Sequence, residues 1–286
     1  MTTPCLWETR ALLGETPVWH EAQRRLYWLD IKSHLLLSCD AAGGKRSAVP
    51  LGREAAGLVP RKSGGFVVGI RGALAALDEN GAITKLVALD NKPGNRFNDA
   101  KADSTGRLWI GSMHDAETKA SGALYRVSTK LTATRVEQRY VVTNGPAISP
   151  DGRTLYHTES PSRTIYAFDL GSSGRLSRKR VFLRFSEAEG YPDGMTCDAK
   201  GNLWVAHWGG SRVTCRDTNG ALRSTIDLPT PFVTSCCFGG KDYRTLFITT
   251  ASIGLAPEVR AKDPLAGGLF AAKPGATGLP PDMFAG

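Results

Sequence analysis

The chain has 286 residues, with 36 Lys and Arg against 27 Asp and Glu, and a hydrophobic content of 41%. This is the composition of an ordinary globular protein, which excludes disordered, collagen-like and coiled-coil chains. The net charge of +9 comes from basic residues scattered along the chain rather than gathered in one patch. We therefore expect no nucleic-acid partner. No stretch approaches the roughly 18 uncharged apolar residues that a membrane helix needs, so we expect no membrane partner.

The first residues place Glu8 and Arg10 in an apolar stretch without a small-residue cleavage site, which argues against a secretory signal. The six cysteines are spread without C-x-x-C spacing. They are therefore expected to be reduced thiols, and no zinc-thiolate site is predicted. These features predict a cytoplasmic protein, either a monomer or a weak homo-oligomer.

Short β-rich runs alternate with turns containing Gly, Asp and Asn, which is typical of an all-β protein. One phrase recurs along the chain: a turn, then Leu or Phe, followed by aromatic, β-branched or small residues. A second strand-like phrase often follows it. Successive copies are about 40 to 48 residues apart and begin at Leu26, Phe66, Leu108, Leu155, Leu203 and Leu246.

Six copies at this interval predict a six-bladed β-propeller, because a β-sandwich has no reason to repeat every 45 residues or so. Residues 5–12 precede the first copy and are the natural strand to complete the last blade. We expect one propeller domain over residues 1–286. Asp151-Gly152 and Lys200-Gly201-Asn202 are expected to form tight hairpins between the first and second strands of their blades.

The innermost strand of each blade should precede the repeated phrase by about ten residues. Four blades place an acid or an amide there, in the turn-like contexts GETP, RFND, TNGP and YPDG: Glu15, Asn98, Asn144 and Asp193. Oxygen ligands that converge on one axis repel each other unless a cation lies between them, so the set predicts a divalent metal site at the mouth of the tunnel. Turn capping by Asn and Asp is the simpler alternative.

Hairpin geometry returns the second strand of each blade to the same mouth, and predicts a second ring of side chains. The ring consists of Asp30, His114 with Asp115, Glu159, and His207 with Trp208. The two histidines fit a catalytic or ligand role, or equally well a hydrogen-bonded place in a loop. His157 lies in the middle of a strand and is expected to be a hydrogen-bonded residue inside its blade.

Four segments carry a family resemblance: LGETPVWHEAQRRLYWLDI, NRFNDAKADSTGRLWIGSM, TNGPAISPDGRTLYHTES and YPDGMTCDAKGNLWVAHWGG. In this order they resemble the SMP-30/gluconolactonase/regucalcin-like family, over about residues 13–270. The resemblance implies a six-bladed propeller, in agreement with the repeats. WIGSMHDAE, YHTES and GGLFAA are most similar to the bacterial pentonolactonases of the family.

The resemblance implies metal ligation by Glu15, Asn144 and Asp193, with Asp193 also as the acid/base. Arg96 and Asn98 match the substrate-contacting Arg and Asn of the family's R-x-N-D motif. The family's acidic substrate contact falls on an alanine here. The flanking acids and the preceding histidine are therefore the remaining substrate-binding candidates: Asp115, Glu117 and His114.

The implied reaction is hydrolysis of a sugar aldonolactone, a pentono- or gluconolactone, to the aldonic acid, with a metal-polarised carbonyl. Calcium or zinc is the expected cofactor, and iron(II), manganese or magnesium would accept the same donors. Two alternatives stay open: another lactone or ester hydrolase on the same site, and a non-catalytic calcium-binding propeller. The sequence contains no G-x-S-x-G serine elbow, Walker loop or dinucleotide-binding fingerprint.

Overall fold

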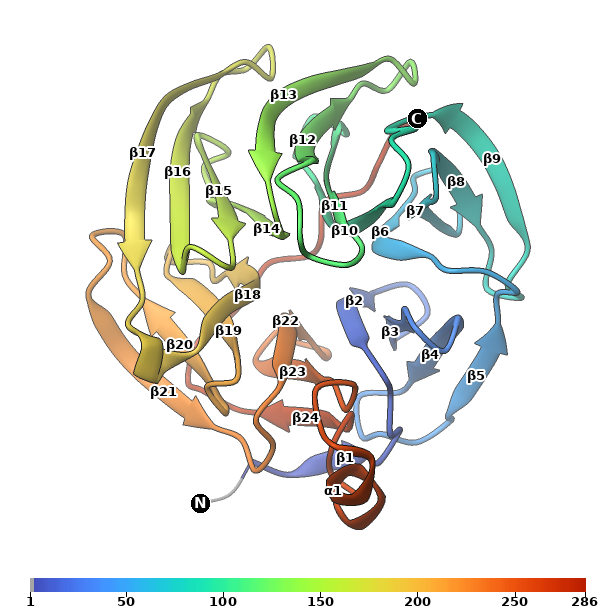
Figure 1. The fold of residues 1–286 in the computed structure, drawn as a ribbon, viewed down its shortest axis with the longest axis vertical. Helices are drawn as coiled ribbons and strands as arrows, with labels where there is room; N and C mark the ends of the chain where they lie inside the picture. The colour runs from blue at the N-terminus through green and yellow to red at the C-terminus, as the bar shows by residue number, and fades with distance from the viewer. Residues whose placement is uncertain (1–2) are drawn as a thin grey trace.

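The computed structural model describes residues 3–286. In these residues, six four-stranded antiparallel sheets surround a central axis, so the predicted six-bladed propeller is confirmed (Figure 1). The first blade consists of β2 (Gly14–His20), β3 (Arg25–Asp30), β4 (Leu35–Cys39) and β5 (Ser47–Pro50). The second consists of β6 (Ala56–Pro60), β7 (Phe66–Ile70), β8 (Ala73–Leu77) and β9 (Ile83–Ala88). The third consists of β10 (Asn95–Ala102), β11 (Leu108–His114), β12 (Gly122–Val127) and β13 (Ala133–Tyr140).

The fourth blade consists of β14 (Thr143–Ile148), β15 (Thr154–Glu159), β16 (Thr164–Leu170) and β17 (Leu176–Arg184). The fifth consists of β18 (Tyr191–Cys197), β19 (Leu203–Trp208), β20 (Arg212–Arg216) and β21 (Leu222–Asp227). The sixth consists of β22 (Val233–Gly239), β23 (Thr245–Thr250), β24 (Leu269–Ala272) and β1 (Cys5–Trp7). The described part of the chain also contains two short helices between strands: η1 (Glu187–Glu189) and α1 (Pro257–Lys262).

The N-terminal strand closes the ring. β1 pairs antiparallel with β24, with Cys5 opposite Phe270 and Trp7 opposite Leu269. The chain therefore begins and ends its circuit in the same blade, as the position of residues 5–12 before the first repeat predicts. This pairing covers the edge of β24 that would otherwise be open.

The repeated phrase of the sequence marks the second strand of every blade. Its six leading residues lie in β3, β7, β11, β15, β19 and β23, and each is 0% exposed. In two blades the tryptophan of the phrase is anchored by the preceding turn: Trp109 Nε1 donates to Asp103 Oδ2 at 2.8 Å, and Trp204 Nε1 donates to Asp198 Oδ2. The same aspartates accept backbone N–H groups of their turns. Each copy of the repeat thus supplies a buried core residue, and in these two blades its turn also holds the tryptophan in place.

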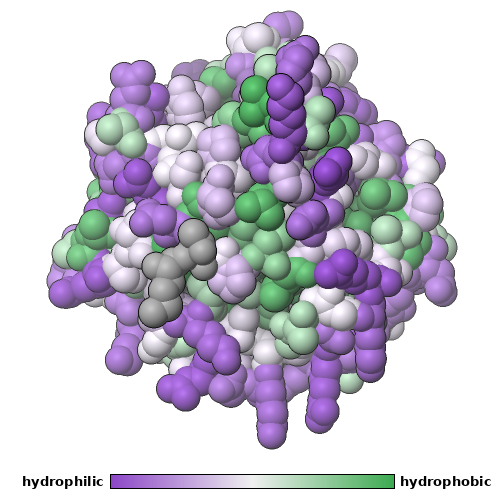
Figure 2. Space-filling model, turned by 90° about the horizontal axis from the view of Figure 1, so that it is seen from below, coloured by the Kyte–Doolittle hydropathy of each residue, from purple (hydrophilic) through white to green (hydrophobic). Residues whose placement is uncertain are grey.

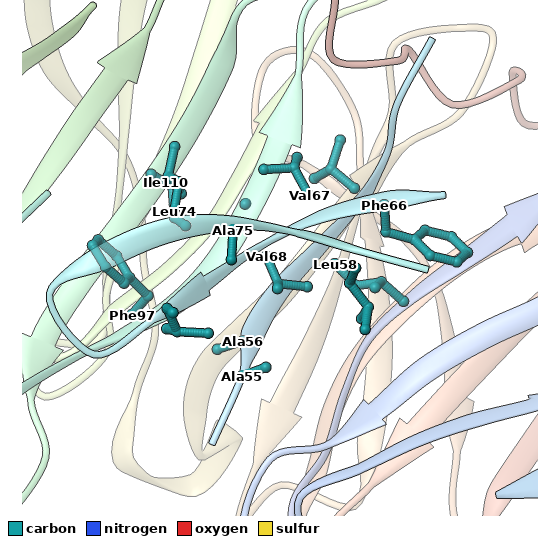
Figure 3. Packing of buried hydrophobic residues seen from close by; sticks show 14 of the residues in the cluster. Ala55, Ala56, Leu58, Phe66, Val67, Val68, Leu74, Ala75, Phe97 and Ile110 are labelled. Carbon is teal, nitrogen blue, oxygen red and sulfur yellow. The ribbon is translucent and has the colours of Figure 1, made fainter. Parts of the chain in front are cut away.

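Neighbouring blades pack through apolar side chains, and Figure 3 shows this between the second and third blades. Phe97 of β10 lies against Gly69 of β7, where an added Cβ would approach the Phe97 side chain to 2.4 Å. Val68 and Ile110 are 0% exposed in the same cluster. A glycine is required at position 69 because the neighbouring blade already fills the space.

Each of the six inner strands has a shift in its register with the second strand. The shifts occur in β2, β6, β10, β14, β18 and β22, between residues 15 and 18, 56 and 59, 97 and 100, 144 and 147, 192 and 195, and 233 and 235. A β-bulge locally twists a strand and re-aims a side chain. The bulges coincide with the four positions that the sequence singles out, so the same irregularity turns each of these side chains toward the axis.

The C-terminal segment crosses the opposite end of the tunnel (Figure 1). Phe284 is fully buried there, and its backbone exchanges hydrogen bonds with Pro60 and Lys62. A cavity of about 210 Å³ remains at this end, lined in part by Leu279 and Asp282 of the segment. The C-terminal segment thus forms part of the wall at this end, opposite the mouth.

The outer surface is mixed in character. Viewed from the edge that carries the N-terminal strand, hydrophilic side chains form most of the outline and hydrophobic groups gather toward the middle (Figure 2). Within residues 3–286, no helix is long and apolar enough to cross a membrane. All six cysteines are free, as their spacing predicts.

Candidate functional site

Four inner strands bring the predicted oxygen donors into one cavity at the mouth of the tunnel. The cavity has a volume of about 520 Å³. β2, β10, β14 and β18 contribute Glu15, Asn98, Asn144 and Asp193 to its lining. Each of these residues is at most 6% exposed. The four positions predicted from the repeat therefore do converge in space.

The two carboxylates of this set are in an electrostatically unfavourable place. Burial, together with the charge of Asp193, raises the pKa of Glu15 well above its usual value. Burial, together with the charge of Asp99, raises the pKa of Asp193 in the same way. Asp99 itself accepts the Gly145 N–H at 2.9 Å, and burial raises its pKa to about 6. Three buried acids near one another call for a positive charge between them.

The donor set fits a divalent cation. Within residues 3–286, Asp193 Oδ1 is buried without a hydrogen-bond partner, so a carboxyl oxygen is left for a ligand. Among the same residues, no three His, Cys, Asp or Glu side chains form a metal-binding group. The reason is that the third donor is an amide: the oxygens would come from Glu15, Asn144 and Asp193. Carboxylate and amide oxygens are the ligands of hard or borderline divalent ions.

The two asparagines are linked by hydrogen bonds that leave few free atoms. Asn98 Nδ2 donates to Thr143 O at 2.8 Å and to Asn144 Oδ1 at 2.6 Å. Asn98 Oδ1 accepts from Arg96 Nη1 at 2.7 Å. Both N–H bonds of Asn98 and one lone pair of its Oδ1 are therefore used inside the protein, and the second lone pair of Oδ1 is what it still offers to a substrate.

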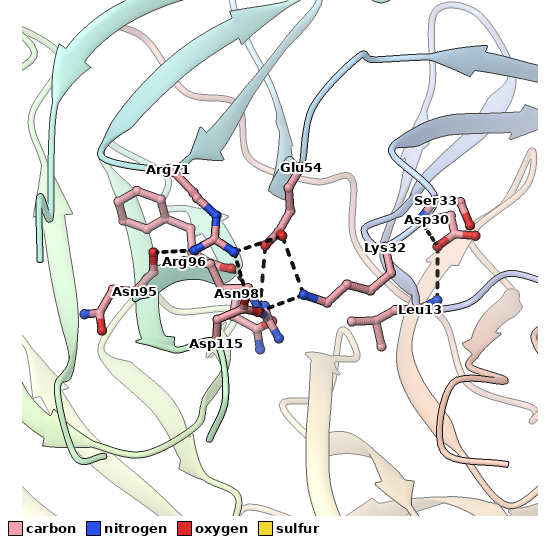
Figure 4. Close-up of polar contacts among 11 residues, drawn as sticks. Leu13, Asp30, Lys32, Ser33, Glu54, Arg71, Asn95, Arg96, Asn98 and Asp115 are labelled. Carbon is pink, nitrogen blue, oxygen red and sulfur yellow. Dashed lines mark hydrogen bonds and ion pairs between the residues drawn. The ribbon is translucent and has the colours of Figure 1, made fainter. Parts of the chain in front are cut away.

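One side of the mouth is a network of charged side chains from the first three blades, shown in Figure 4. Lys32 Nζ lies 2.7 Å from Asp115 Oδ1, and Arg96 Nε lies 3.0 Å from the same oxygen. Arg71 pairs with Asp115 and with Glu54. Burial alone would raise the pKa of Asp115, but hydrogen bonds from Lys32 and Arg71 and the surrounding positive charges lower it to about 2. We call these five residues the charged wall.

The other side of the mouth comes mainly from the last three blades and is apolar. Trp208, at the end of β19, packs against Phe232 with ring centroids 4.4 Å apart and the rings tilted by 35°. Tyr191 begins β18, and the Arg163 guanidinium lies 4.3 Å from its ring centroid. We call the apolar cavity-lining residues the apolar wall: Leu13, Val142, Pro161, Tyr191, Trp208 and Ile253.

The second ring of side chains predicted at the mouth is only partly present. Trp208, Asp115 and Glu117 line the cavity. The expectation that Asp30 faces it is wrong, because its carboxylate accepts the N–H groups of Leu12 and Leu13 and is buried in that turn.

His207 and Glu159 also lie inside their blades. His207 is 0% exposed, and its ring nitrogens lie 2.9 Å from Glu189 O and 2.8 Å from Thr214 Oγ1. Burial lowers its pKa to about 4, so it is neutral at physiological pH. Glu159 is hydrogen-bonded to the Val141 N–H, and burial raises its pKa to about 7. Of the two roles open to His207, the structural one is the one found.

Two other histidines also differ from the sequence expectation: His114 does not line the cavity, and His157 is not hydrogen-bonded among the described residues. His114 Nδ1 lies 3.2 Å from Thr118 Oγ1, in a turn away from the cavity lining. His157 is fully buried in its blade as predicted, yet within the described residues neither ring nitrogen has a hydrogen-bond partner. It packs edge-on against Tyr140 instead, with ring centroids 4.7 Å apart.

Sequence reasoning missed Lys32, Glu54, Tyr191 and Ser160 as part of the site. Lys32 stands two residues after the rim position Asp30 at the end of β3, and Ser160 stands one residue after Glu159 at the end of β15. The repeat therefore contains a signal for both positions. Glu54 and Tyr191 lie at the entrances of inner strands, where the repeated phrase carries no signal.

The comparisons with known proteins identify the family of the chain. Residues 13–252 match the model of the SMP-30/Gluconolactonase/LRE-like region. The chain belongs to this family. It is 35% identical to regucalcin of Gallus gallus over 99% of this chain and 98% of that protein. It is 33% identical to 6-deoxy-6-sulfogluconolactonase of Pseudomonas putida, over 100% of this chain and 99% of that protein.

Among solved structures, the protein is similar to a calcium-binding regucalcin of Agrobacterium tumefaciens. The TM-score is 0.94 at 27% identity, over 99% of this chain and 97% of that one. The family assignment thus rests on sequence and on fold over nearly the whole length.

Proposed function

We propose that this protein is a carboxylic ester hydrolase that opens a sugar aldonolactone to its aldonic acid with the help of one divalent cation. The observation that carries the proposal is the convergence of Glu15, Asn144 and Asp193 in one cavity, where Asp193 Oδ1 is buried and has no hydrogen-bond partner among the described residues. Membership of a family that contains a sugar lactonase supports the substrate class.

Glu15, Asn144 and Asp193 would hold the cation, which supplies Lewis-acid polarisation of the lactone carbonyl when it is bound. Asp193 takes a proton from the attacking water as the water oxygen bonds to the carbonyl carbon. It returns that proton to the ring oxygen as the carbon–oxygen bond breaks. The carboxylic acid product then ionises and releases one proton to solution.

Arg96 and the charged wall hold the sugar ring. Arg96 uses Nε on Asp115 and Nη1 on Phe97 O and Asn98 Oδ1, which fixes the plane of its guanidinium. Its Nη2 donors then bind sugar hydroxyls or the oxygen that becomes negative in the transition state. On the other side, the Trp208 ring provides a flat surface for the C–H face of the sugar.

The test is proton release from D-xylono-1,4-lactone, L-arabino-1,4-lactone and D-glucono-1,5-lactone. EDTA-stripped protein is assayed alone and after addition of calcium, zinc, manganese, magnesium or iron(II). We expect hydrolysis above the spontaneous rate that requires one of these cations. Cation binding without acceleration of any lactone would overturn the proposal.

The apolar wall favours a second candidate, hydrolysis of a less polar ester or lactone on the same residues. Six of the cavity-lining side chains are apolar, and Ile253 is 43% exposed at the rim. Phenyl acetate and a non-sugar lactone belong in the same assay for this reason. A kcat/KM for either that exceeds that of every sugar lactone would favour this candidate.

A third candidate, a non-catalytic calcium-binding propeller, draws support from the calcium-binding regucalcin that the fold resembles. It predicts that calcium binds and that none of the esters or lactones turns over. The substrate-sized cavity beside the cation donors argues for an enzyme instead.

A further inference from the structure

Ser160 lies directly behind one of the proposed cation ligands. It follows β15, lines the cavity and is 7% exposed. Its Oγ lies 2.9 Å from Asn144 Nδ2 and 2.7 Å from Pro192 O. Ser160 thus joins Asn144 of the fourth blade to the residue that precedes Asp193 in the fifth.

The chemistry of these three groups determines which way the Asn144 amide faces. Pro192 O is a backbone carbonyl and can only accept, so the single hydroxyl hydrogen of Ser160 must be donated to it. Ser160 Oγ can then only accept from its second partner. The group of Asn144 that faces Ser160 is therefore the NH2 group, and Oδ1 lies on the other side of the amide.

The opposite side of the amide leads to the same orientation. Asn98 Nδ2 donates to Thr143 O, which is also a backbone carbonyl and can only accept. The second hydrogen of Asn98 Nδ2 then points to Asn144, whose facing atom must be the acceptor Oδ1, at 2.6 Å. Two backbone carbonyls from different blades thus impose one orientation on Asn144.

This orientation matters because only the oxygen of an amide ligates a cation. The hydrogen bond from Asn98 uses one lone pair of Asn144 Oδ1 and leaves the other. A rotation of the amide by about 180° would replace this oxygen with an NH2 group, which repels a cation.

We propose that Ser160 is a positioning residue that holds Asn144 with its oxygen toward the cation. The inference rests on the proposed function, because it assumes that Asn144 is a ligand. Loss of the hydroxyl leaves both Asn144 Nδ2 and Pro192 O without their partner, and only the hydrogen bond from Asn98 then opposes rotation of the amide. Groups that orient a ligand in this way typically change metal affinity by about 10- to 100-fold.

The experiment measures cation binding to EDTA-stripped protein by titration calorimetry, with calcium, manganese and zinc chlorides as probes. Ser160→Ala is expected to weaken binding by about 10- to 100-fold, and Ser160→Thr, which keeps the hydroxyl, by less than about threefold. The matched control is Ser162→Ala. Ser162 Oγ donates to Glu159 O in the same turn, so this variant removes a similar hydrogen bond away from Asn144.

A second background separates amide orientation from general damage to the turn. In Asn144→Asp both terminal atoms are oxygens, so no wrong orientation exists. Ser160→Ala added to Asn144→Asp is therefore expected to change cation affinity by less than about threefold. Far-ultraviolet circular dichroism and thermal unfolding of the metal-free variants establish that each is folded.

The outcomes distinguish the two proposals. Wild-type protein that binds none of the three cations, and whose lactone hydrolysis is not restored by magnesium or iron(II) either, overturns the proposed function, and this inference with it. Wild-type binding with equal affinities for Ser160→Ala and Ser162→Ala overturns the role of Ser160 alone. The same holds if Ser160→Ala costs as much affinity in the Asn144→Asp background as in wild type.

Discussion

The two walls of the mouth cavity are built from the same repeat and have opposite chemistry. The charged wall comes from the first three blades and contains three cations and two carboxylates, with Asp115 at its centre. The apolar wall comes mainly from the last three blades and includes Trp208, which packs against Phe232. A sugar lactone has the same division, with hydroxyl groups around its edge and C–H bonds on its faces. Under the proposed function, each wall would bind the part of the sugar lactone that matches its chemistry.

The largest effect is expected where the two walls meet, at the carboxylates between them. Asp193→Ala and Glu15→Gln should each lose the cation and at least about a thousandfold in kcat, because polarisation and proton transfer both depend on these groups. Metal content by mass spectrometry and lactone hydrolysis measure the two losses together. Turnover close to wild type with the cation still bound would contradict the assignment.

Arg96→Ala tests the charged wall without touching the cation donors. We expect kcat/KM to fall by about 100-fold, because an oriented donor to the developing oxyanion is lost, while the metal content stays at the wild-type value. A metal-free Arg96→Ala protein would instead mean that this arginine holds the structure of the site.

Trp208→Ala tests the apolar wall, and we expect it to change KM rather than kcat. A flat surface for the sugar face contributes equally to substrate and transition state, so we expect KM to rise by about tenfold and kcat to stay within about twofold. Trp208→Phe keeps an aromatic ring and is the control. A loss that appears mainly in kcat would show that the two walls are not separated in this way.

The smallest effect concerns pH. The basic side chains of the charged wall lower the pKa of Asp115 from 3.8 to about 2 in the folded protein. A carboxylate whose pKa is lowered in the folded state stabilises the fold at pH values above its unfolded-state pKa. This contribution is lost as the pH falls from 3.8 through about 2. Asp115→Asn should therefore lower the free energy of unfolding by about 1 kcal/mol at pH 7, since solvent at the rim screens part of the effect.

The same substitution should cost progressively less as the pH falls below 4, as measured by urea unfolding. Ile253→Ala on the apolar wall is the comparison, because its cost involves no titrating group and should be the same at each pH. A cost of Asp115→Asn that does not change with pH would mean that its ion pairs contribute little to stability.

The propeller could be predicted from the sequence because every blade buries the same kind of residue at the same place in its second strand. Leu26, Leu108 and Leu203 stand in equivalent places, and each is completely buried. The predicted cation donors could be located for the same reason, since Glu15, Asn144 and Asp193 occupy one phase of the repeat. Glu15 and Asn144 stand where the register shift of their strand begins, and Asp193 stands one residue inside the shift of β18.

Residues outside this phase could not be placed in the same way. His207 and Asp30 stand where the repeat predicts the rim of the mouth. Local hydrogen bonds hold His207 inside its blade and the Asp30 carboxylate in the turn at residues 12 and 13. Lys32 and Arg71 meet Asp115 only because blades 40 or more residues apart close into a ring. The orientation of Asn144 depends on Ser160 and on two carbonyls from neighbouring blades.

The sequence by itself therefore determined the number of blades, the closing strand and the ring of oxygen donors, because these repeat along the chain. Only the tertiary structure decided which polar side chains reach the cavity, how the mouth divides into a charged and an apolar wall, and how Asn144 is held. Those features depend on contacts between blades, and the spacing of residues within one blade carries no record of them.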